Sequence, residues 1–355
     1  MSLKLLFVNA SLTDGGSERA MSLVAQTLAT RGHDVTMALV REKESTYPID
    51  PSVLIAQFRY RARGKIGKSL ERVRQLRSAI KSRDYDYVVC YMWDLNITTL
   101  IASLGLRKRV IVSERAFPGT STRSRLTRLL EDLSYRLAFR IVYQTRDAQA
   151  FCPPKLMSRS VVVPNMVEAR EADAYKGERH KRVVSIGRLG AQKNFPLLLR
   201  SFARFIETNP EWTLEIYGRG ALENELRALA DELGIRDSVV FAGYVDDIAD
   251  RIRTAGMFVL SSDFEGISNA MSEAMALGLP VVCTDCPVGG ASLLIDDRVS
   301  GLLVPVRDED AMTAAMLDVG TDPVLAKTIS NGAQASVARF TPERVASIWE
   351  KGVLC

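Results

Sequence analysis

Residues 257–284, MFVLSSDFEGISNAMSEAMALGLPVVCT, hold one complete unit of the pattern that determines the fold. An apolar run ends near Ser261, and a polar loop follows it. From Ser268 or Asn269, either of which can cap a helix, small and apolar residues recur at helical spacing. A second apolar run begins at Pro280. A strand, a helix and a strand of these lengths predict two parallel strands with the helix packed on the sheet.

The same alternation of short apolar strands and amphipathic helices runs along most of the chain. In the first part the expected strands are residues 3–9, 34–40, 85–92, 109–114, 140–145 and 160–165. In the second part they are residues 183–187, 213–218, 239–243, 257–261, 280–284 and 301–305. We therefore expect an α/β protein with two doubly wound domains. Their boundaries are 1–167, a charged linker 168–182, 183–338, and a last helix within 339–355 that packs back on the first domain.

The composition of the 355 residues is that of a soluble globular protein, with 47% hydrophobic and 25% charged residues. No apolar run reaches the ~18 residues of a membrane-spanning helix, and the first residues are better explained as a buried strand than as a signal peptide. We therefore expect a cytoplasmic protein with reduced thiols at Cys90, Cys152, Cys283, Cys286 and Cys355. Cys283 and Cys286 form a CxxC sequence. Because the chain has only two histidines, we favour packing of these cysteines in the core over metal binding.

Charge divides the chain into two unlike parts. Residues 1–170 carry 28 Lys and Arg against 15 Asp and Glu, whereas the remaining residues carry 19 against 27. Much of the basic excess lies in residues 58–83, where apolar residues from Ile66 onward predict a basic amphipathic helix. Such a helix is typical of attachment to an anionic membrane. A solvated helix face is the alternative, and nucleic acid is not favoured because only Phe58 and Tyr60 accompany the charges.

Polar residues of the second domain gather after its strands, where doubly wound sheets bind ligands. Arg188 and Lys193 lie in the loop after one strand. A guanidinium and an ammonium group suit a diphosphate, although a solvated loop explains them too. Gly218 and Gly220 follow the next strand, and close approach to a ligand and helix capping account for them equally well.

Two carboxylates, Glu265 and Glu273, lie eight positions apart in the segment quoted first. Glu265 belongs to the loop and Glu273 to the first or second turn of the helix. Backbone N–H groups at the helix start attract anions, and a carboxylate beside them can accept hydrogen bonds from sugar hydroxyls. Acidic residues also stabilise a helix N-terminus without any ligand, so the pair alone leaves both explanations open.

Several stretches, in this order, resemble glycosyltransferase family 4, whose members have the GT-B fold. They are GRLGAQKN (187–194), YGRGALENELRALADELGI (217–235), VVFAGYV (239–245), SSDFEGISNAMSEAMALGLPVVCTD (261–285) and GLLVP (301–305). TDGGSERAMSLVAQTLATRGHDVTM (13–37) is similar to the family's N-terminal Gly-Gly loop and helix. The resemblance covers nearly the whole chain. It implies two Rossmann-like domains that face each other across a cleft, and a retaining transferase that uses a nucleotide-sugar donor.

The resemblance also implies roles for individual residues. Glu265 contacts the donor sugar, and Glu273 binds the ribose hydroxyls. Arg188 and Lys193 neutralise the departing diphosphate, which requires no metal ion, so these two residues and Glu265 are the expected catalytic residues. The other residues expected at the donor are Gly15, Gly16, Gly218, Gly243, Tyr244, Val245, Gly266, Ile267, Ser268 and Asn269.

The sequence departs from the family in the loop after the strand at 109–114. Many relatives have a histidine there, whereas this chain has Glu114 and Arg115. Glu114 can orient an acceptor hydroxyl and Arg115 can bind an anionic acceptor, with Lys68 and Arg72 as further basic candidates; a structural Glu–Arg pair is an equal alternative. Two Asp-x-Asp sequences, at 84–86 and 308–310, are interpreted as a strand entry and a helix start rather than as metal ligands.

We therefore expect transfer of a sugar, from a uridine diphosphate donor by resemblance, to a glycan or a lipid-linked diphosphate acceptor during assembly of bacterial surface polysaccharide or lipopolysaccharide. The expected location is the inner face of the cytoplasmic membrane, with peripheral attachment, no nucleic-acid partner and no metal cofactor. Two other functions stay open: a sugar-nucleotide epimerase of the same fold, and a non-catalytic nucleotide-sugar-binding subunit. The shortage of histidines disfavours the first, and the intact set of basic residues and glutamates disfavours the second.

Overall fold

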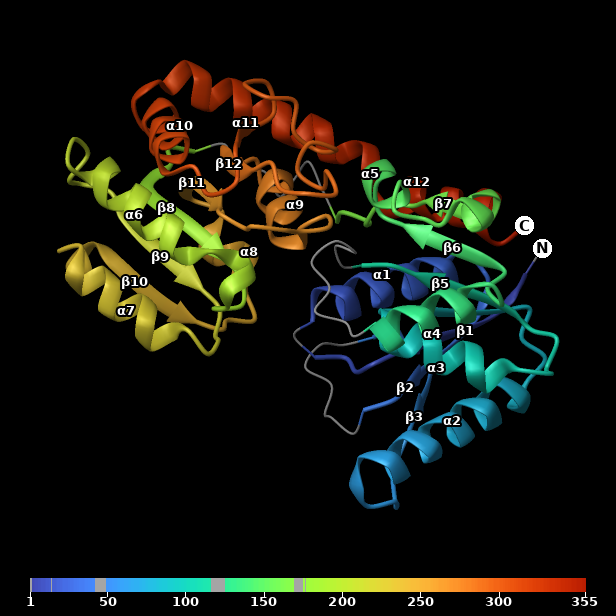
Figure 1. Ribbon diagram of the computed structural model, residues 1–355. Helices are drawn as coiled ribbons and strands as arrows, with labels where there is room; N and C mark the ends of the chain where they lie inside the picture. Colours follow the sequence, from blue (N-terminus) through green and yellow to red (C-terminus); the bar gives the residue numbers. More distant parts are fainter. Residues whose placement is uncertain (1, 14, 42–48, 116–124, 169–174, 176) are drawn as a thin grey trace. The chain divides into compact units, whose positions relative to one another are not determined.

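The computed structural model describes residues 2–13, 15–41, 49–115, 125–168, 175 and 177–355, and of residues 125–128 the backbone alone. The chain divides into two units (Figure 1): unit 1 comprises residues 1–166 and 342–355, and unit 2 comprises residues 167–341. The predicted linker is too long at its end, because His180 already begins a strand. Residues 169–174 and 176 of that linker lie outside the described residues. No described helix combines the length and the apolar character that crossing a bilayer requires.

Unit 1 is built on a parallel sheet whose strands lie in the order β3–β2–β1–β4–β5–β6–β7. The strands are β1 (Lys4–Asn9), β2 (Asp34–Leu39), β3 (Leu54–Gln57), β4 (Tyr87–Tyr91), β5 (Arg109–Ser113), β6 (Arg140–Tyr143) and β7 (Ser160–Val162). The strand order changes direction between β1 and β4, which is the switch point of a doubly wound sheet. The apolar runs predict every described strand here except β3, a short edge strand with mostly exposed side chains.

Helices of unit 1 pack in two layers. They are α1 (Gly16–Thr30), α2 (Gly64–Ser82), α3 (Trp93–Ser103), α4 (Arg125–Tyr135), α5 (Arg146–Gln149) and α12 (Pro342–Ile348). α3 contacts both α2 and α4, whereas α1 contacts α12 (Figure 1). The chain thus returns to unit 1 at its end, where Trp349 is fully buried. There Glu350 forms an ion pair with Arg31 (2.6 Å) and a hydrogen bond with His33 Nε2 (3.2 Å).

Unit 2 has a second parallel sheet, in the order β10–β9–β8–β11–β12–β13. Its strands are β8 (His180–Ile186), β9 (Thr213–Tyr217), β10 (Val239–Gly243), β11 (Ala255–Leu260), β12 (Val281–Thr284) and β13 (Leu302–Val304). Its helices are α6 (Phe195–Ile206), α7 (Glu223–Glu232), α8 (Ile248–Ile252), α9 (Asn269–Ala276), α10 (Glu309–Thr321) and α11 (Pro323–Val337).

Burial on both faces explains why the strands of unit 2 are continuous apolar runs. In β11, Met257 and Val259 belong to the core that α6, α7 and α10 cover. Phe258 and Leu260 belong to the core on the opposite face, which α8 and α9 cover. The doubly wound architecture predicted for this unit is therefore confirmed, and its switch point lies between β8 and β11.

Candidate functional site

Two loops meet at the switch point of unit 2. The loop after β8 contains the 3-10 turn η4 (Ala191–Lys193), and the loop after the neighbouring strand β11 leads to α9. Ser261 Oγ donates a hydrogen bond to the Lys193 carbonyl (2.9 Å), and Gln192 Nε2 donates one to the Phe264 carbonyl (2.9 Å). The two loops therefore hold each other in place at the carboxyl edge of the sheet.

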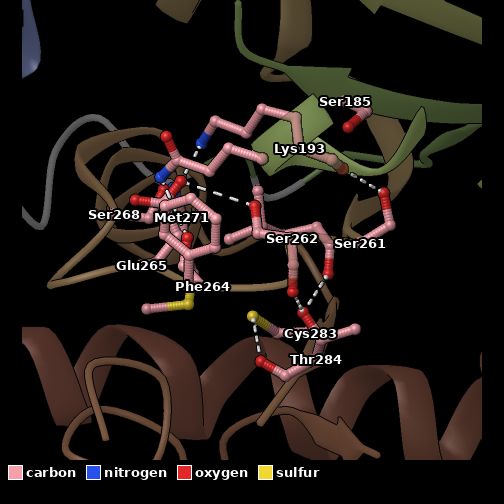
Figure 2. A network of polar contacts seen from close by, with 12 residues as sticks. Ser185, Lys193, Ser261, Ser262, Phe264, Glu265, Ser268, Met271, Cys283 and Thr284 are labelled. Atoms are coloured by element: carbon pink, nitrogen blue, oxygen red, sulfur yellow. Dashed lines mark hydrogen bonds and ion pairs between the residues drawn. The ribbon is translucent and has the colours of Figure 1, made fainter. Parts of the chain in front are cut away.

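An ion pair joins two of the predicted catalytic residues across these loops. Lys193 Nζ lies 2.5 Å from Glu265 Oε1, and each side chain is only 15% exposed (Figure 2). Ser262 Oγ donates a weaker hydrogen bond to the same carboxylate oxygen (3.4 Å). Lys193 and Glu265 are therefore each other's counterion.

Arg188, the third predicted catalytic residue, precedes Lys193 in the same loop but is exposed. Its backbone carbonyl accepts a hydrogen bond from Gly190 N (2.8 Å). Within the described parts of the chain, its guanidinium forms no ion pair. The loop therefore holds one cation that is paired with a carboxylate, Lys193, and one that is exposed to solvent, Arg188.

Close backbone approach explains the Gly-x-Gly pair after β9. A Cβ at Gly218, which has φ of 137°, would lie 2.0 Å from the Gly187 carbonyl oxygen, and one at Gly220 would lie 2.1 Å from the Leu189 carbonyl oxygen. Gly218 N also donates to the Gly243 carbonyl (2.7 Å). The close contact is thus with protein backbone, and it brings the ends of β8, β9 and β10 together; neither helix capping nor a ligand is needed to explain it.

The helix that carries Glu273 begins as predicted. Ser268 is the N-cap of α9, and its side chain accepts a hydrogen bond from Met271 N (3.4 Å). Glu273 lies on the second turn and is half-buried. The loop after β12 packs on the loop before the helix so closely that a Cβ at Gly290 would lie 1.8 Å from the Gly266 carbonyl oxygen.

The remaining residues predicted at the donor fall into two places. Ile267 and Asn269 flank the cap of α9, and Ile267 is buried. Tyr244 and Val245 follow β10, and Tyr244 is 41% exposed. All of these residues lie at the carboxyl edge of the same sheet.

In unit 1 the predicted Gly-Gly loop follows β1, beside the switch point of that sheet. Gly15 precedes α1 and Gly16 is its first residue. A buried carboxylate that the sequence analysis missed supports this loop: Glu18 accepts hydrogen bonds from Ser11 Oγ (2.8 Å) and Thr13 Oγ1 (3.2 Å). Hydroxyl residues before the Gly-Gly pair and a glutamate two positions after it are the signal that could have revealed the network.

Glu114 and Arg115 do not form the structural pair that was one alternative. Glu114 is buried and accepts hydrogen bonds from the Tyr135 hydroxyl and from Asn96 Nδ2 (3.4 Å). Burial, followed by the adjacent Glu114 charge, raises the pKa of Tyr135. Arg115 lies instead over the ring of Tyr91, with its Cζ 3.9 Å from the ring centroid.

The other two acceptor candidates lie on a different element. Lys68 and Arg72 belong to α2, where Lys68 is exposed and Arg72 is half-buried. No described hydrogen bond or ion pair links either residue to the loop after β5. The predicted helix from Ile66 onward is confirmed, but only Leu76 and Ile80 are fully buried, and Ile66 and Leu70 remain exposed.

The residues weighed as metal ligands have other roles. Cys283 and Cys286 are free and buried, and burial raises the pKa of Cys286 to about 12. Asp84 forms an ion pair with Lys108 (2.5 Å). Asp308 caps α10 by accepting a hydrogen bond from Ala311 N (2.9 Å). Among the described residues, no group of three or more His, Cys, Asp or Glu side chains is placed to hold a metal ion.

Family models match both units. Residues 15–166 match the glycosyl transferase 4-like domain, and residues 180–322 match the glycosyl transferases group 1. The chain therefore belongs to the glycosyltransferases that combine these two domains, and its fold is GT-B.

Individual relatives agree over nearly the whole chain. The amylovoran biosynthesis glycosyltransferase AmsD of Erwinia amylovora is 24% identical over 97% of each chain. An alpha-1,4-N-acetyl-D-galactosaminyltransferase of Campylobacter jejuni, named for a PP-undecaprenol-linked glycan, is 26% identical over 98% of each chain. The crystal structure of Anabaena HepE in complex with UDP and glucose has a TM-score of 0.81 at 19% identity, covering 98% of each chain.

Proposed function

We propose that the protein is a retaining glycosyltransferase that moves a sugar from uridine diphosphate to a hydroxyl of a glycan or lipid-linked acceptor. The observation that carries the proposal is the Lys193–Glu265 ion pair at the switch point, with the exposed Arg188 in the same loop. The structural neighbour with UDP and glucose supports the donor. The relative named for an alpha linkage and a PP-undecaprenol glycan supports retention and the acceptor class.

The charges of the site suit the changes that the reaction causes. When the bond between sugar C1 and the phosphate oxygen breaks, its electron pair moves to the diphosphate and positive charge develops on the sugar ring. Arg188 and Lys193 stabilise the diphosphate without a metal ion. The acceptor oxygen forms the new bond to C1, and its proton passes to the departing diphosphate.

Donor binding exchanges the counterion of Lys193. A phosphate group takes the place of Glu265 beside the ammonium, because the dianionic diphosphate attracts it more strongly. Glu265 is then free to accept hydrogen bonds from the sugar hydroxyls and to face the positive ring. Glu273, on the second turn of α9, accepts hydrogen bonds from the ribose hydroxyls. Gly243, Tyr244 and Val245 border the base.

Kinetics with a radiolabelled donor test this site. Lys193→Ala should lower kcat by about 10²-fold or more, because it removes a preorganised cation from the leaving group. The matched control is Arg182→Ala: Arg182 forms an ion pair of similar burial with Glu215 (2.7 Å) on β8 and β9, outside the two loops. Equal kcat for the two variants would refute the site.

Two further readouts separate the competing activities. Product formed without any acceptor would indicate an epimerase, whereas a transferase needs the acceptor hydroxyl. The anomeric configuration of the product, read by NMR, tests retention directly. An inverted product would overturn that part of the proposal.

We further propose peripheral attachment of unit 1 to the inner face of the cytoplasmic membrane. The segment that leads into α2 and the helix itself expose seven basic residues: Arg59, Arg61, Arg63, Lys65, Lys68, Arg74 and Lys81. Ile66 is 79% exposed and Leu70 64% exposed among them. Like α2, α4 packs against α3. Exposed leucines lie on α4 and just after it: Leu129, Leu130, Leu133 and Leu137. Apolar side chains among basic ones match an anionic bilayer surface.

A further inference from the structure

A group of polar side chains lies at the carboxyl edge of the sheet in unit 1. Tyr91 ends β4, Arg115 follows β5, Gln144 follows β6 and Asn165 follows β7. Arg115 Nη1 donates a hydrogen bond to Asn165 Oδ1 (2.6 Å), and Gln144 Nε2 donates to the same oxygen (2.9 Å). The ends of four adjacent parallel strands therefore converge on one guanidinium.

The charge of Arg115 has no carboxylate partner in the described parts of the chain. Its sequence neighbour Glu114 turns toward Tyr135 and Asn96 instead. The Nε of Arg115 is buried and makes no hydrogen bond with any described residue. Burial lowers the pKa of the Arg115 guanidinium, with only Tyr91 acting in the opposite direction. A buried cation without a counterion is costly to a folded protein.

A second unpaired donor lies beside the first. Tyr91 is 1% exposed, and its hydroxyl donates no hydrogen bond to any described residue. The guanidinium of Arg115 stacks over the Tyr91 ring, so the two donors belong to one site. Buried hydroxyls in native proteins are nearly always paired, which makes two adjacent exceptions informative.

The backbone beside these donors is strained. Met92, the residue after Tyr91, has φ of 72°, which a non-glycine residue rarely adopts. It lies at the end of β4, next to the switch point between β1 and β4, and Ser17 Oγ of the Gly-Gly helix lies 3.1 Å from its Sδ. Strain of this kind concentrates at ligand sites.

We propose that Arg115 and the Tyr91 hydroxyl bind an oxyanion of the acceptor. The inference deepens the proposed function and rests on it for the identity of the substrate. An oxyanion supplies both the missing negative charge and the missing hydrogen-bond acceptors, and a guanidinium binds it through two parallel hydrogen bonds. The phosphate of a lipid diphosphate and the carboxylate of an acidic acceptor sugar share this chemistry.

Titration with inorganic pyrophosphate tests the anion site without relying on catalysis. The Lys193→Ala background is used so that binding at the loops of unit 2 is reduced. In that background Arg115→Ala should weaken pyrophosphate binding by about tenfold or more, as expected for a charge-assisted hydrogen bond. Tyr91→Phe should weaken it as well while leaving thermal stability unchanged or higher, because the lost hydroxyl donates no hydrogen bond to any described residue.

Arg109→Ala is the matched control for the titration. Arg109 begins the same strand, stacks over Tyr87 (5.6 Å to the centroid) and donates to the Tyr87 hydroxyl (2.9 Å), so it reproduces the packing of Arg115 at the opposite end. It should bind pyrophosphate as the background does. Equal affinity of the Arg109 and Arg115 variants would overturn the proposal.

Transfer kinetics identify the source of the oxyanion. With a diphosphate-linked acceptor, Arg115→Ala should raise the acceptor KM by about tenfold and leave the donor KM unchanged. If an acceptor with the same glycan on an uncharged linker shows no such rise, the oxyanion is the lipid diphosphate. A rise with both acceptors places it in the glycan, and no rise with either contradicts the proposal. If the wild-type protein transfers no sugar, the proposed function fails, and the pyrophosphate titration still decides this site.

Discussion

Lys193 and Glu265 neutralise each other's charge, so the proposed nucleotide donor must compete with a carboxylate for the ammonium. Uridine diphosphate alone lacks the transferred sugar that would contact Glu265. Replacing Glu265 by Gln removes the competitor while preserving the size of the side chain. We expect Glu265→Gln to bind uridine diphosphate about fivefold more tightly than the wild type in calorimetry, since a partly exposed ion pair contributes about 1 kcal/mol.

Glu273→Gln provides the contrast for that experiment. It removes a carboxylate that is proposed to accept hydrogen bonds from the ribose hydroxyls. It should therefore weaken the binding of uridine diphosphate. Opposite signs for the two variants would distinguish the roles of the two glutamates. If Glu265→Gln bound the nucleotide as weakly as Glu273→Gln does, the competition between carboxylate and phosphate would be disproved.

The structural role of a single residue was predictable from the sequence where neighbouring residues determine it. The cap at Ser268 follows from its position before a helix, and the structure confirms it. The contact between Lys193 and Glu265 depends on β8 and β11 being neighbours, which no local pattern encodes. Arg115 and Tyr91 are likewise brought together only by the order of the strands.

At the scale of elements, the loop before α9 is fixed by the loop after β12. A Cβ at Gly290 would lie 1.8 Å from the Gly266 carbonyl oxygen, so Gly290→Ala must displace the segment that carries Glu265. We expect a loss of about 1–3 kcal/mol in the free energy of unfolding and a lower kcat. Gly190→Ala is the control, because no atom lies within 4 Å of its Cβ position. Unchanged kcat for Gly290→Ala would show that the loop is not constrained in this way.

The exposed start of α2 makes a prediction about membranes. The double substitution Ile66→Glu and Leu70→Glu removes apolar contact and adds two negative charges. It should reduce partition into vesicles of anionic phospholipid by more than about tenfold, since each charge near the surface contributes about 1 kcal/mol. Val324→Glu, at a site 73% exposed on α11 in unit 2, should leave partition unchanged. Equal partition of both proteins would refute attachment through α2.

Helical periodicity identified α2 but not which of its turns is buried. Leu76 and Ile80 pack in the core of unit 1, whereas Ile66 and Leu70 recur at the same spacing and remain exposed. The spacing of apolar residues indicates which face of a helix is apolar. How much of that face is buried depends on how far the neighbouring elements extend along the helix. The edge strand β3 was missed for a similar reason, because its mostly exposed side chains give no apolar run.

At the scale of the whole molecule, one ion pair cluster holds the end of the chain on unit 1. Hydrogen bonds from Arg31, and then from His33, lower the pKa of Glu350 to about 2, against the competing effect of burial. A depressed carboxyl pKa stabilises the fold at pH values above about 4.5, the ordinary value, and this contribution is lost as the pH falls toward 2.

Glu350→Gln should therefore be less stable than the wild type at pH 7, by about 1 kcal/mol, as expected for a partly exposed ion pair. The difference in Tm between the two proteins should shrink as the pH falls below about 4.5. Thermal melts from pH 2 to pH 7 measure it. A difference that stayed constant over this range would mean that the charge of Glu350 is not what stabilises the segment.

The return of the C-terminal segment to unit 1 also sets an order for biosynthesis. A ribosome releases residues 1–166 first, but α1 then still lacks α12, and the buried Trp349 has not yet been made. Unit 2, whose residues are contiguous, can complete its core while residues 1–166 of unit 1 still have an uncovered surface. The half of the protein that is translated first is thus the half that matures last, and a nascent chain stalled before residue 342 would expose the surface of α1 that α12 covers.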